Sequence, residues 1–164
     1  MKKINNVVVI GAGTMGYGIA SHLANVNCNV HLLDLPGENS RYEILDKALE
    51  NIKKSDPPLL FHKNKIKNIK IGNLEDDFDA VCNADWIIEA IVERVDIKHE
   101  LYDKIIKKRK KGSLISSNTS TIPLKVLTEK MSDDNKKDFC ITHFFNPVRF
   151  MLSLIHISEP TRPY

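Results

Sequence analysis

The stretch VVVIGAGTMGYGIASHLA, residues 7–24, decides the fold of this 164-residue chain. It opens with an unbroken run of β-branched residues, which is typical of a strand buried on both faces of a parallel sheet. The glycine-rich turn GAGTMG follows directly, and apolar residues then recur at helical spacing at Ile19, Ala20, Leu23 and Ala24. The stretch therefore predicts a strand, a tight turn and a helix in succession.

The turn matches the spacing GxGxxG, which on its own is weak evidence because glycine-rich turns are common. Its context is complete, since a second predicted strand, CNVHLLD, ends in an acid about 20 residues further on. The three glycines would permit the tight turn, the approach of a pyrophosphate and close helix–strand packing, and the helix start would offer free N–H groups. We expect six residues to hold the diphosphate of a dinucleotide: Gly11, Ala12, Gly13, Thr14, Met15 and Gly16.

The acid that ends the second strand is Asp34. A carboxylate at this place accepts hydrogen bonds from both hydroxyls of an adenine ribose, and its charge would repel a 2′-phosphate. Leu35 follows it, with no arginine beside it. The pattern therefore favours NAD over NADP. The alternative is that the glycines only form a turn and that Asp34 is a capping residue.

The composition fits one soluble globular domain, with 42% hydrophobic and 27% charged residues. A net charge of +3 is too small, and too evenly spread, to indicate a nucleic-acid partner. The densest basic run, KIIKKRKKG (residues 104–112), is typical of the carboxyl end of a helix, with Gly112 as its cap.

Cysteine usage and hydropathy favour a cytoplasmic protein. The three cysteines are widely spaced and form no CxxC pair, so neither a zinc site nor a disulfide framework is expected. The apolar run at residues 7–10 is too short for a signal peptide, and no stretch is long enough to cross a bilayer. We expect no metal site and no membrane insertion.

Beyond the first unit, predicted helices and strands alternate. An amphipathic helix spans residues 39–55, with Ser40 as its N-cap, and another helix spans residues 95–110. The buried strands are expected within residues 69–73, 84–93, 112–120 and 138–147. This alternation predicts an α/β fold, a doubly wound, mostly parallel sheet with helices on both faces.

Ligands of such sheets bind beyond the carboxyl ends of the strands. Four polar clusters are expected at these ends: residues 11–16, Asp34, Glu89 with Glu93, and residues 117–120 with residues 143–146. Their common location predicts a single binding crevice.

Ser120 and His143 are the residues most suited to chemistry in this crevice. A dehydrogenase needs a base for the proton of the substrate hydroxyl, and histidine titrates in the right range. The hydroxyl of Ser120 could hold the same substrate oxygen. The alternatives are that both residues are structural, or that they form a nucleophilic pair, although no nucleophile-elbow glycines flank Ser120. The other five histidines are expected to be surface or packing residues.

Four segments resemble, in order and with similar gaps, the NAD-binding domain of the L-3-hydroxyacyl-CoA dehydrogenase family: VVVIGAGTMGYGIASHLA, EAIVERVDIK, SSNTSTIPL and THFFNPVRFM. This family includes the dehydrogenase part of multifunctional fatty-acid β-oxidation enzymes. The resemblance covers residues 4–151 and implies a Rossmann-type domain over residues 1–151.

By position, the resemblance implies that residues 11–16 hold the pyrophosphate of NAD and that Asp34 holds its ribose. It implies that three further residues line the cofactor site: Glu93, Lys98 and Asn146. Ser120 would contact the cofactor and the 3-oxygen of the substrate, and His143 would be the catalytic base. The acyl-CoA would lie between this domain and a following helical domain that also forms a homodimer.

The resemblance ends after Met151. The family carries a Glu that pairs with the catalytic histidine, and it should fall at position 155, where this chain has Ile155. Residues 152–162 instead resemble the translation of a common sequencing adapter. We therefore interpret residues 152–164 as a non-native tail on a truncated domain that lacks the helical domain; a naturally divergent C-terminus is the alternative.

The sequence thus predicts the NAD-binding domain of an enzyme that oxidises L-3-hydroxyacyl-CoA to 3-ketoacyl-CoA, with little or no turnover by this fragment alone. Two other functions stay open. One is a β-hydroxyacid dehydrogenase of a neighbouring Rossmann family, and the other is a non-catalytic NAD-sensing module.

Overall fold

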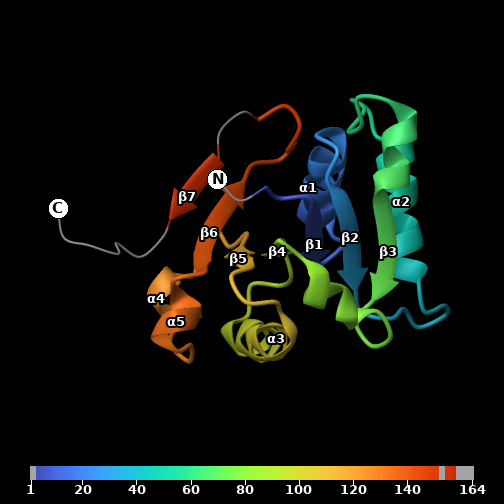
Figure 1. Cartoon of the computed structure of the whole chain (residues 1–164). Coiled ribbons are helices and arrows are strands. Elements are labelled where there is room, and N and C mark those ends of the chain that lie inside the picture. Colours follow the sequence, from blue (N-terminus) through green and yellow to red (C-terminus); the bar gives the residue numbers. More distant parts are fainter. Residues whose placement is uncertain (1–2, 152–153, 158–164) are drawn as a thin grey trace.

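The structure is a computed structural model that describes residues 3–151 and 154–157. In these residues a seven-stranded sheet has the order β3-β2-β1-β4-β5-β6-β7 (Figure 1). Strands β1 to β6 are parallel to one another, and β7 is antiparallel to β6. The strands are β1 (Asn6–Ile10), β2 (Asn29–Asp34), β3 (Ile69–Asn73), β4 (Trp86–Glu89), β5 (Leu114–Ser117), β6 (Phe139–Phe144) and β7 (Leu154–Ile157).

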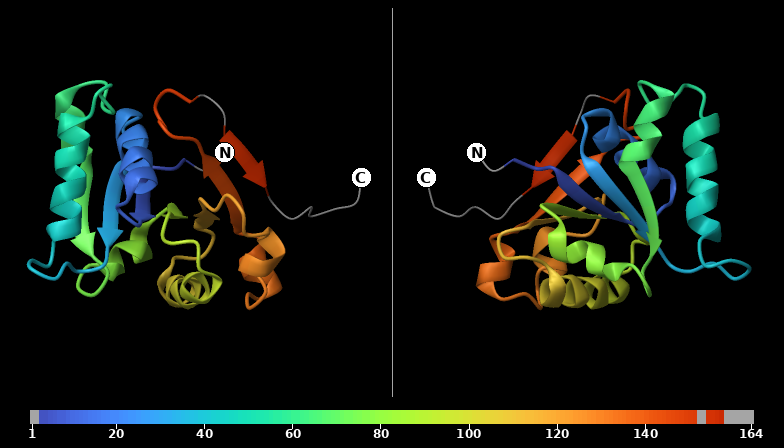
Figure 2. Two further views of the ribbon diagram at one scale, coloured as in Figure 1. Left: turned by 180° about the vertical axis from the view of Figure 1, so that it is seen from behind. Right: turned by 45° about the vertical axis from the view of Figure 1, so that its right-hand side comes forward.

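Helices cover both faces of this sheet (Figure 2). The α-helices are α1 (Thr14–Asn25), α2 (Glu43–Lys54), α3 (Val95–Lys108), α4 (Leu124–Leu127) and α5 (Asp133–Lys136). Two 3-10 helices, η1 (Lys63–Asn68) and η2 (Phe78–Asn83), flank β3. None of the helices within the described ranges combines the length and the apolar character that a bilayer-crossing helix needs. The predicted doubly wound α/β fold is confirmed.

Strand β1 lies at the centre of the sheet and is buried on both faces. Val7 and Val9 pack into a core with α1 and α2, whereas Val8 and Ile10 pack into a second core with α3 and α4. Successive side chains of a strand point to opposite faces. The unbroken β-branched run is therefore explained by a strand that contributes to two cores.

Two predicted helix caps are wrong. Helix α2 begins at Glu43, and the hydroxyl of Ser40 accepts a hydrogen bond from the N–H of Tyr42 in the bend before it (3.3 Å). Helix α3 ends at Lys108, because Arg109 turns to an extended conformation and donates to the carbonyl of Ser113. Gly112, with φ of 74°, belongs to the turn that enters β5.

Strand β7 was not expected from the sequence, which predicts no element after residue 151. Residues 154–157 pair with the free side of β6, while residues 152–153 and 158–164 of the predicted tail lie outside the described residues. An open sheet edge presents unpaired N–H and C=O groups to any extended segment. The LIHI segment has the β-branched and apolar composition that suits such pairing.

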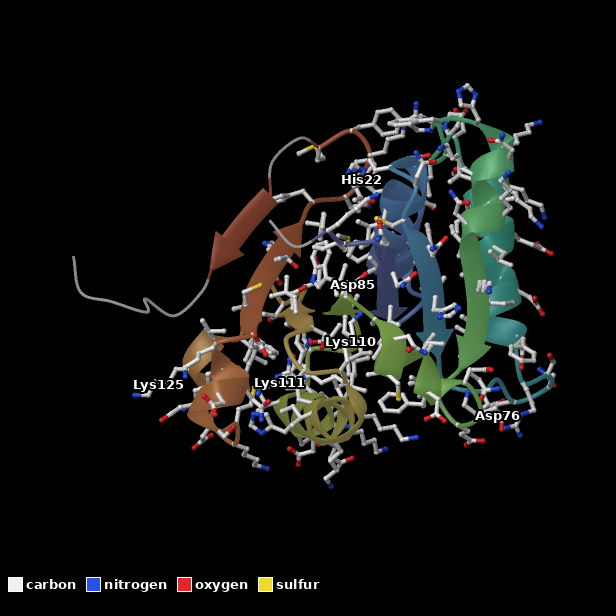
Figure 3. The ribbon with its side chains drawn as sticks, viewed as in Figure 1. His22, Asp76, Asp85, Lys110, Lys111 and Lys125 are labelled. Atoms are coloured by element: carbon white, nitrogen blue, oxygen red, sulfur yellow. The ribbon has the colours of Figure 1, made fainter. Side chains whose placement is uncertain are left out.

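Asp85 joins the amino ends of β1 and β4 to the turn after α3. Its Oδ2 accepts hydrogen bonds from the N–H groups of Asn5 and Asn6, both at 2.9 Å, and its Oδ1 lies 2.7 Å from Nζ of Lys110. Figure 3 labels Asp85 and Lys110 below the sheet centre. The hydrogen bond from Asn6, the contact with Lys110 and the hydrogen bond from Asn5 hold the pKa of Asp85 well below its usual range.

We expect Asp85→Asn to lower the free energy of unfolding at neutral pH by about 2 kcal/mol, because hydrogen bonds to charged groups contribute roughly 1.5–3 kcal/mol. A carboxyl whose pKa is depressed by folding stabilises the fold above its unfolded pKa of about 3.9, and this contribution is lost as the pH falls through the folded pKa. In urea unfolding, the gap to the wild type should therefore shrink from about pH 5 to about pH 2. The exposed Asp103→Asn variant is the control, and a gap independent of pH would contradict the assignment.

Candidate active site

The glycine turn between β1 and α1 is built by two close backbone contacts. Gly11 has a φ of 103°, and a Cβ there would lie 2.4 Å from the carbonyl oxygen of Ala90. A Cβ on Gly16 would lie 1.7 Å from the carbonyl oxygen of Gly11. Neither position can carry a side chain, because the turn, the helix and β4 meet there.

Gly13 differs from the other two glycines of the motif. Its φ is −65°, which any residue adopts, and a Cβ there would meet nothing within 4 Å. The fold alone therefore does not require a glycine at this position. The open space lies at the start of α1, where free N–H groups favour an anion. This is the arrangement expected if a diphosphate lies against the backbone.

Asp34 lies at the carboxyl end of β2, beside the glycine turn. Its carboxylate accepts hydrogen bonds from the N–H groups of Ala12 (2.6 Å) and Leu35 (2.7 Å). Leu35 is 61% exposed. The predicted proximity of Asp34 to the glycine turn is confirmed. Arg41, the next arginine along the chain, forms its ion pairs with Glu75 and Asp76.

A pocket of about 210 Å³ lies beyond the carboxyl ends of β1, β4, β5 and β6. Ser120 and His143 line it together, although they are separated by a strand and two short helices in the chain. The complete lining is Met15, Ala90, Ile91, Glu93, Asn118, Ser120, His143 and Phe144. The structure thus unites residues from three of the four predicted polar clusters.

Asn118 aligns the ends of three strands around this pocket. Its N–H donates to the carbonyl of Glu89 at the end of β4 (2.7 Å), and its Oδ1 accepts from the N–H of Phe144 at the end of β6 (2.9 Å). The ring of His143 packs against that of Phe145, with centroids 4.8 Å apart. Asn146 is exposed in the turn that follows and is not among the residues that line the pocket.

Beneath the pocket lies a buried polar network centred on Glu89, which is fully buried. Its Oε1 lies 2.6 Å from Nζ of Lys98 and accepts from the N–H of Ile91 at 2.9 Å. Its Oε2 accepts from the hydroxyls of Tyr102 and Ser117, both at 2.6 Å. Burial and the nearby charge of Glu89 raise the pKa of Tyr102 far above its usual range.

Lys98 connects this network to Glu93. The lysine side chain is 1% exposed, and its Nζ lies 3.0 Å from Oε2 of Glu93. The other oxygen of Glu93 accepts from the hydroxyl of Thr119 (2.8 Å) and the N–H of Ser120 (3.0 Å). Burial raises the pKa of Glu93, but the hydrogen bonds from Ser120, Thr119 and Lys98 outweigh it and hold the pKa below its usual range.

Sequence reasoning missed one member of this network, Tyr102, and it placed Ser117 in a polar cluster without linking it to Glu89. The one available signal was that Tyr102 follows Lys98 by a helical turn, so both residues lie on the same side of α3. The structure also shows that Lys98 lies beneath Glu93 rather than in the pocket wall. Within the described part of the chain, no group of three or more histidine, cysteine or acidic side chains could hold a metal ion.

Four other histidines do not line the pocket. His99 is buried and its Nε2 lies 2.8 Å from the carbonyl oxygen of Val126, whereas His62 is exposed. His22 and His31 are half-buried, and desolvation lowers the pKa of each. Figure 3 labels His22 on α1. These four are surface or packing residues as predicted, and the side chain of His156 lies outside the described residues.

A doubly wound sheet with a glycine turn that faces open space and an acid at the end of β2 is the arrangement of a Rossmann-type dinucleotide-binding domain. The comparison with known families is more specific. The pattern described as "3-hydroxyacyl-CoA dehydrogenase, NAD binding domain" matches residues 6–159, and the chain belongs to this family. Its cofactor is NAD, and the open turn at Gly13 and the carboxylate of Asp34 fit that cofactor.

Two curated relatives show how much of a longer protein this chain represents. It is 48% identical over 151 residues to a putative fatty acid oxidation complex trifunctional enzyme of Rickettsia felis, covering 91% of this chain and 21% of that protein. It is 41% identical over 151 residues to a probable 3-hydroxyacyl-CoA dehydrogenase of Deinococcus radiodurans, covering 91% of this chain and 44% of that protein. The chain therefore spans less than half the length of these relatives.

Among solved structures, 3-hydroxybutyryl-CoA dehydrogenase from Escherichia coli is similar to this chain, with a TM-score of 0.80 and 26% identity. The match covers 94% of this chain and 32% of that one.

The two kinds of glycine in the turn predict separable effects. Gly13→Ala should leave thermal unfolding unchanged but weaken NADH binding at least about tenfold, because the added methyl group occupies the space that the diphosphate needs. Gly16→Ala should instead lower the melting temperature sharply, since the backbone of Gly11 must shift. Nucleotide fluorescence and thermal unfolding of both variants measure this. Equal loss of stability in the two variants would contradict the distinction.

Proposed function

We propose that this chain is the cofactor-binding part of an enzyme that oxidises L-3-hydroxyacyl-CoA to 3-ketoacyl-CoA in fatty-acid β-oxidation. The observation that carries the proposal is the pocket that brings Ser120 and His143 together beside the glycine turn. A purely NAD-sensing module has no need of a proton acceptor and a hydroxyl at that place. The family membership of the chain supports the same reaction.

The cofactor would lie across the carboxyl ends of the strands. Its diphosphate would lie over residues 11–16 and its adenine ribose against Asp34, whose carboxylate already touches the turn at Ala12. The nicotinamide end would then reach the pocket lined by Glu93 and Ser120, and Asn146 would contact the cofactor from the exposed turn after β6. Lys98 would act from below by holding Glu93 in place.

The chemistry assigned to the chain is proton transfer and orientation. NAD⁺, when bound, supplies the hydride acceptor. The imidazole of His143 would take the proton of the substrate 3-hydroxyl while a hydride moves from carbon 3 of the substrate to NAD⁺. The hydroxyl of Ser120 would hold that oxygen in place. Its backbone is fixed for this task, because its N–H donates to Glu93.

Position 155 completes this arrangement in the family, where the resemblance implies a Glu that pairs with the catalytic histidine. In the structure Ile155 is directly opposite His143 in the register of β6 and β7. Directly opposite residues of antiparallel strands lie on the same face of the sheet. The register thus supports position 155 as the place for a partner of His143, and we propose that Ile155 limits the turnover of this chain.

We further propose that the intact enzyme acts on acyl-CoA and that a following helical domain covers the acyl chain. The same domain would form a homodimer, and the enzyme would be cytoplasmic.

Asp34→Ala should weaken NADH binding about tenfold or more, because two hydrogen bonds from ribose hydroxyls to a charged group are lost. NADPH binding should not weaken, since the carboxylate that repels the 2′-phosphate is removed as well. Nucleotide fluorescence measures both affinities, and the exposed Asp46→Ala on α2 is the control. Unchanged NADH affinity would remove Asp34 from the ribose site.

Ile155→Glu should raise kcat/KM for acetoacetyl-CoA reduction by NADH at least about tenfold, because an orienting carboxylate holds the imidazole in its productive tautomer. Ile157→Glu is the matched control: it adds the same charge on the same strand, opposite Ile141 rather than His143. NADH absorbance follows the reaction. The same rate in both variants would contradict the role of position 155, and equal rates on free acetoacetate would favour a β-hydroxyacid dehydrogenase.

A further inference from the structure

The network beneath the pocket contains two carboxylates and one ammonium group. Lys98 lies between Glu89 and Glu93, 2.6 Å from an oxygen of the first and 3.0 Å from an oxygen of the second. One lysine cannot neutralise two carboxylates. When all three groups are ionised, the cluster carries one net negative charge.

Of the two carboxylates, Glu89 has the more extensive hydrogen bonding. Its two oxygens accept from four donors, an ammonium, a backbone N–H and two hydroxyls. Lys98 therefore compensates mainly the negative charge of Glu89 in the interior. The uncompensated negative charge lies toward Glu93, which is the more exposed carboxylate.

Glu93 carries this charge into the pocket wall, since its side chain is 40% exposed and lines the cavity. The neighbouring cation does not cancel it, because Arg94 pairs with Asp96 at 2.5 Å. Among the residues that line the cavity, the other titratable group is His143. The wall is thus electronegative where a nicotinamide ring would lie.

The nicotinamide ring carries a positive charge in NAD⁺ and none in NADH, so a nearby negative charge attracts only the oxidised form. We propose that the Glu89–Lys98–Glu93 cluster makes this site discriminate between the two redox states and favours NAD⁺ relative to NADH. The inference rests on the proposed function, because it requires the nicotinamide end of the cofactor in this pocket. Glu93 would determine which redox state of the cofactor binds more tightly. Glu89 would contribute by compensating the positive charge of Lys98.

The test compares the ratio of the two dissociation constants, Kd(NAD⁺)/Kd(NADH), in variants that alter charge. Glu93→Gln removes the charge and should raise the ratio about three- to tenfold, whereas Glu93→Asp keeps the charge and should leave the ratio within about twofold even if both affinities fall. A tenfold change corresponds to about 30 mV in the two-electron potential of the bound cofactor. Calorimetry measures NAD⁺ binding and fluorescence measures NADH binding.

Asn118→Asp is an independent variant of opposite sign. It adds a negative charge to the same wall, and its Oδ1 can still accept from the N–H of Phe144. The ratio should fall about three- to tenfold. Glu100→Gln, an exposed change on α3 outside the pocket, is the control for net charge and should leave the ratio unchanged.

The proposal is overturned if Glu93→Gln weakens both forms by the same factor, if Glu93→Asp shifts the ratio as much as Glu93→Gln, or if Asn118→Asp does not lower the ratio. These results would give Glu93 a purely positioning role. If the wild-type chain bound neither NAD⁺ nor NADH, the proposed function would be overturned instead.

Discussion

The arrangement of the site depends on one buried carboxylate, that of Glu89 at the end of β4. Its oxygens take hydrogen bonds from α3 through Lys98 and Tyr102 and from β5 through Ser117. A buried charge with an unmet partner costs several kcal/mol, so these elements are held to one geometry. Lys98 also contacts Glu93, and Glu93 accepts a hydrogen bond from the N–H of Ser120, so the loop that contains Ser120 is held in place as well.

A steric constraint acts beside this electrostatic one. The carbonyl of Gly11 lies where a Cβ of Gly16 would be, so α1 approaches β1 as closely as a backbone allows. The start of α1 is thereby fixed next to the end of β4, and Gly13 is left facing open space. The glycine turn and the pocket lined by Ser120 and His143 are adjacent because the end of β4 contacts both of them.

Local sequence patterns were sufficient to predict a structural feature where the residues that form it lie in one segment of the chain. The two-core strand β1, the glycine turn and the acid at Asp34 follow from side-chain periodicity and spacing, and the structure confirms their juxtaposition. Local patterns failed at Ser40 and Gly112, because both residues lie in bends or turns outside the helices, and the helix ends are set by neighbouring backbone conformations that the residue types alone do not fix. No local pattern pointed to β7, which depends on the free edge of β6.

The sequence by itself determined the order of strands and helices along the chain, the glycine turn and the family. Each of these follows from short motifs whose residues are close together in the chain. Only the tertiary structure decided that Lys98 lies beneath Glu93, that Tyr102 and Ser117 share one oxygen of Glu89, and that Ile155 is opposite His143. The physical reason is that parallel crossovers bring together strand ends far apart in the sequence. Which polar atoms then meet is set by sheet order and register.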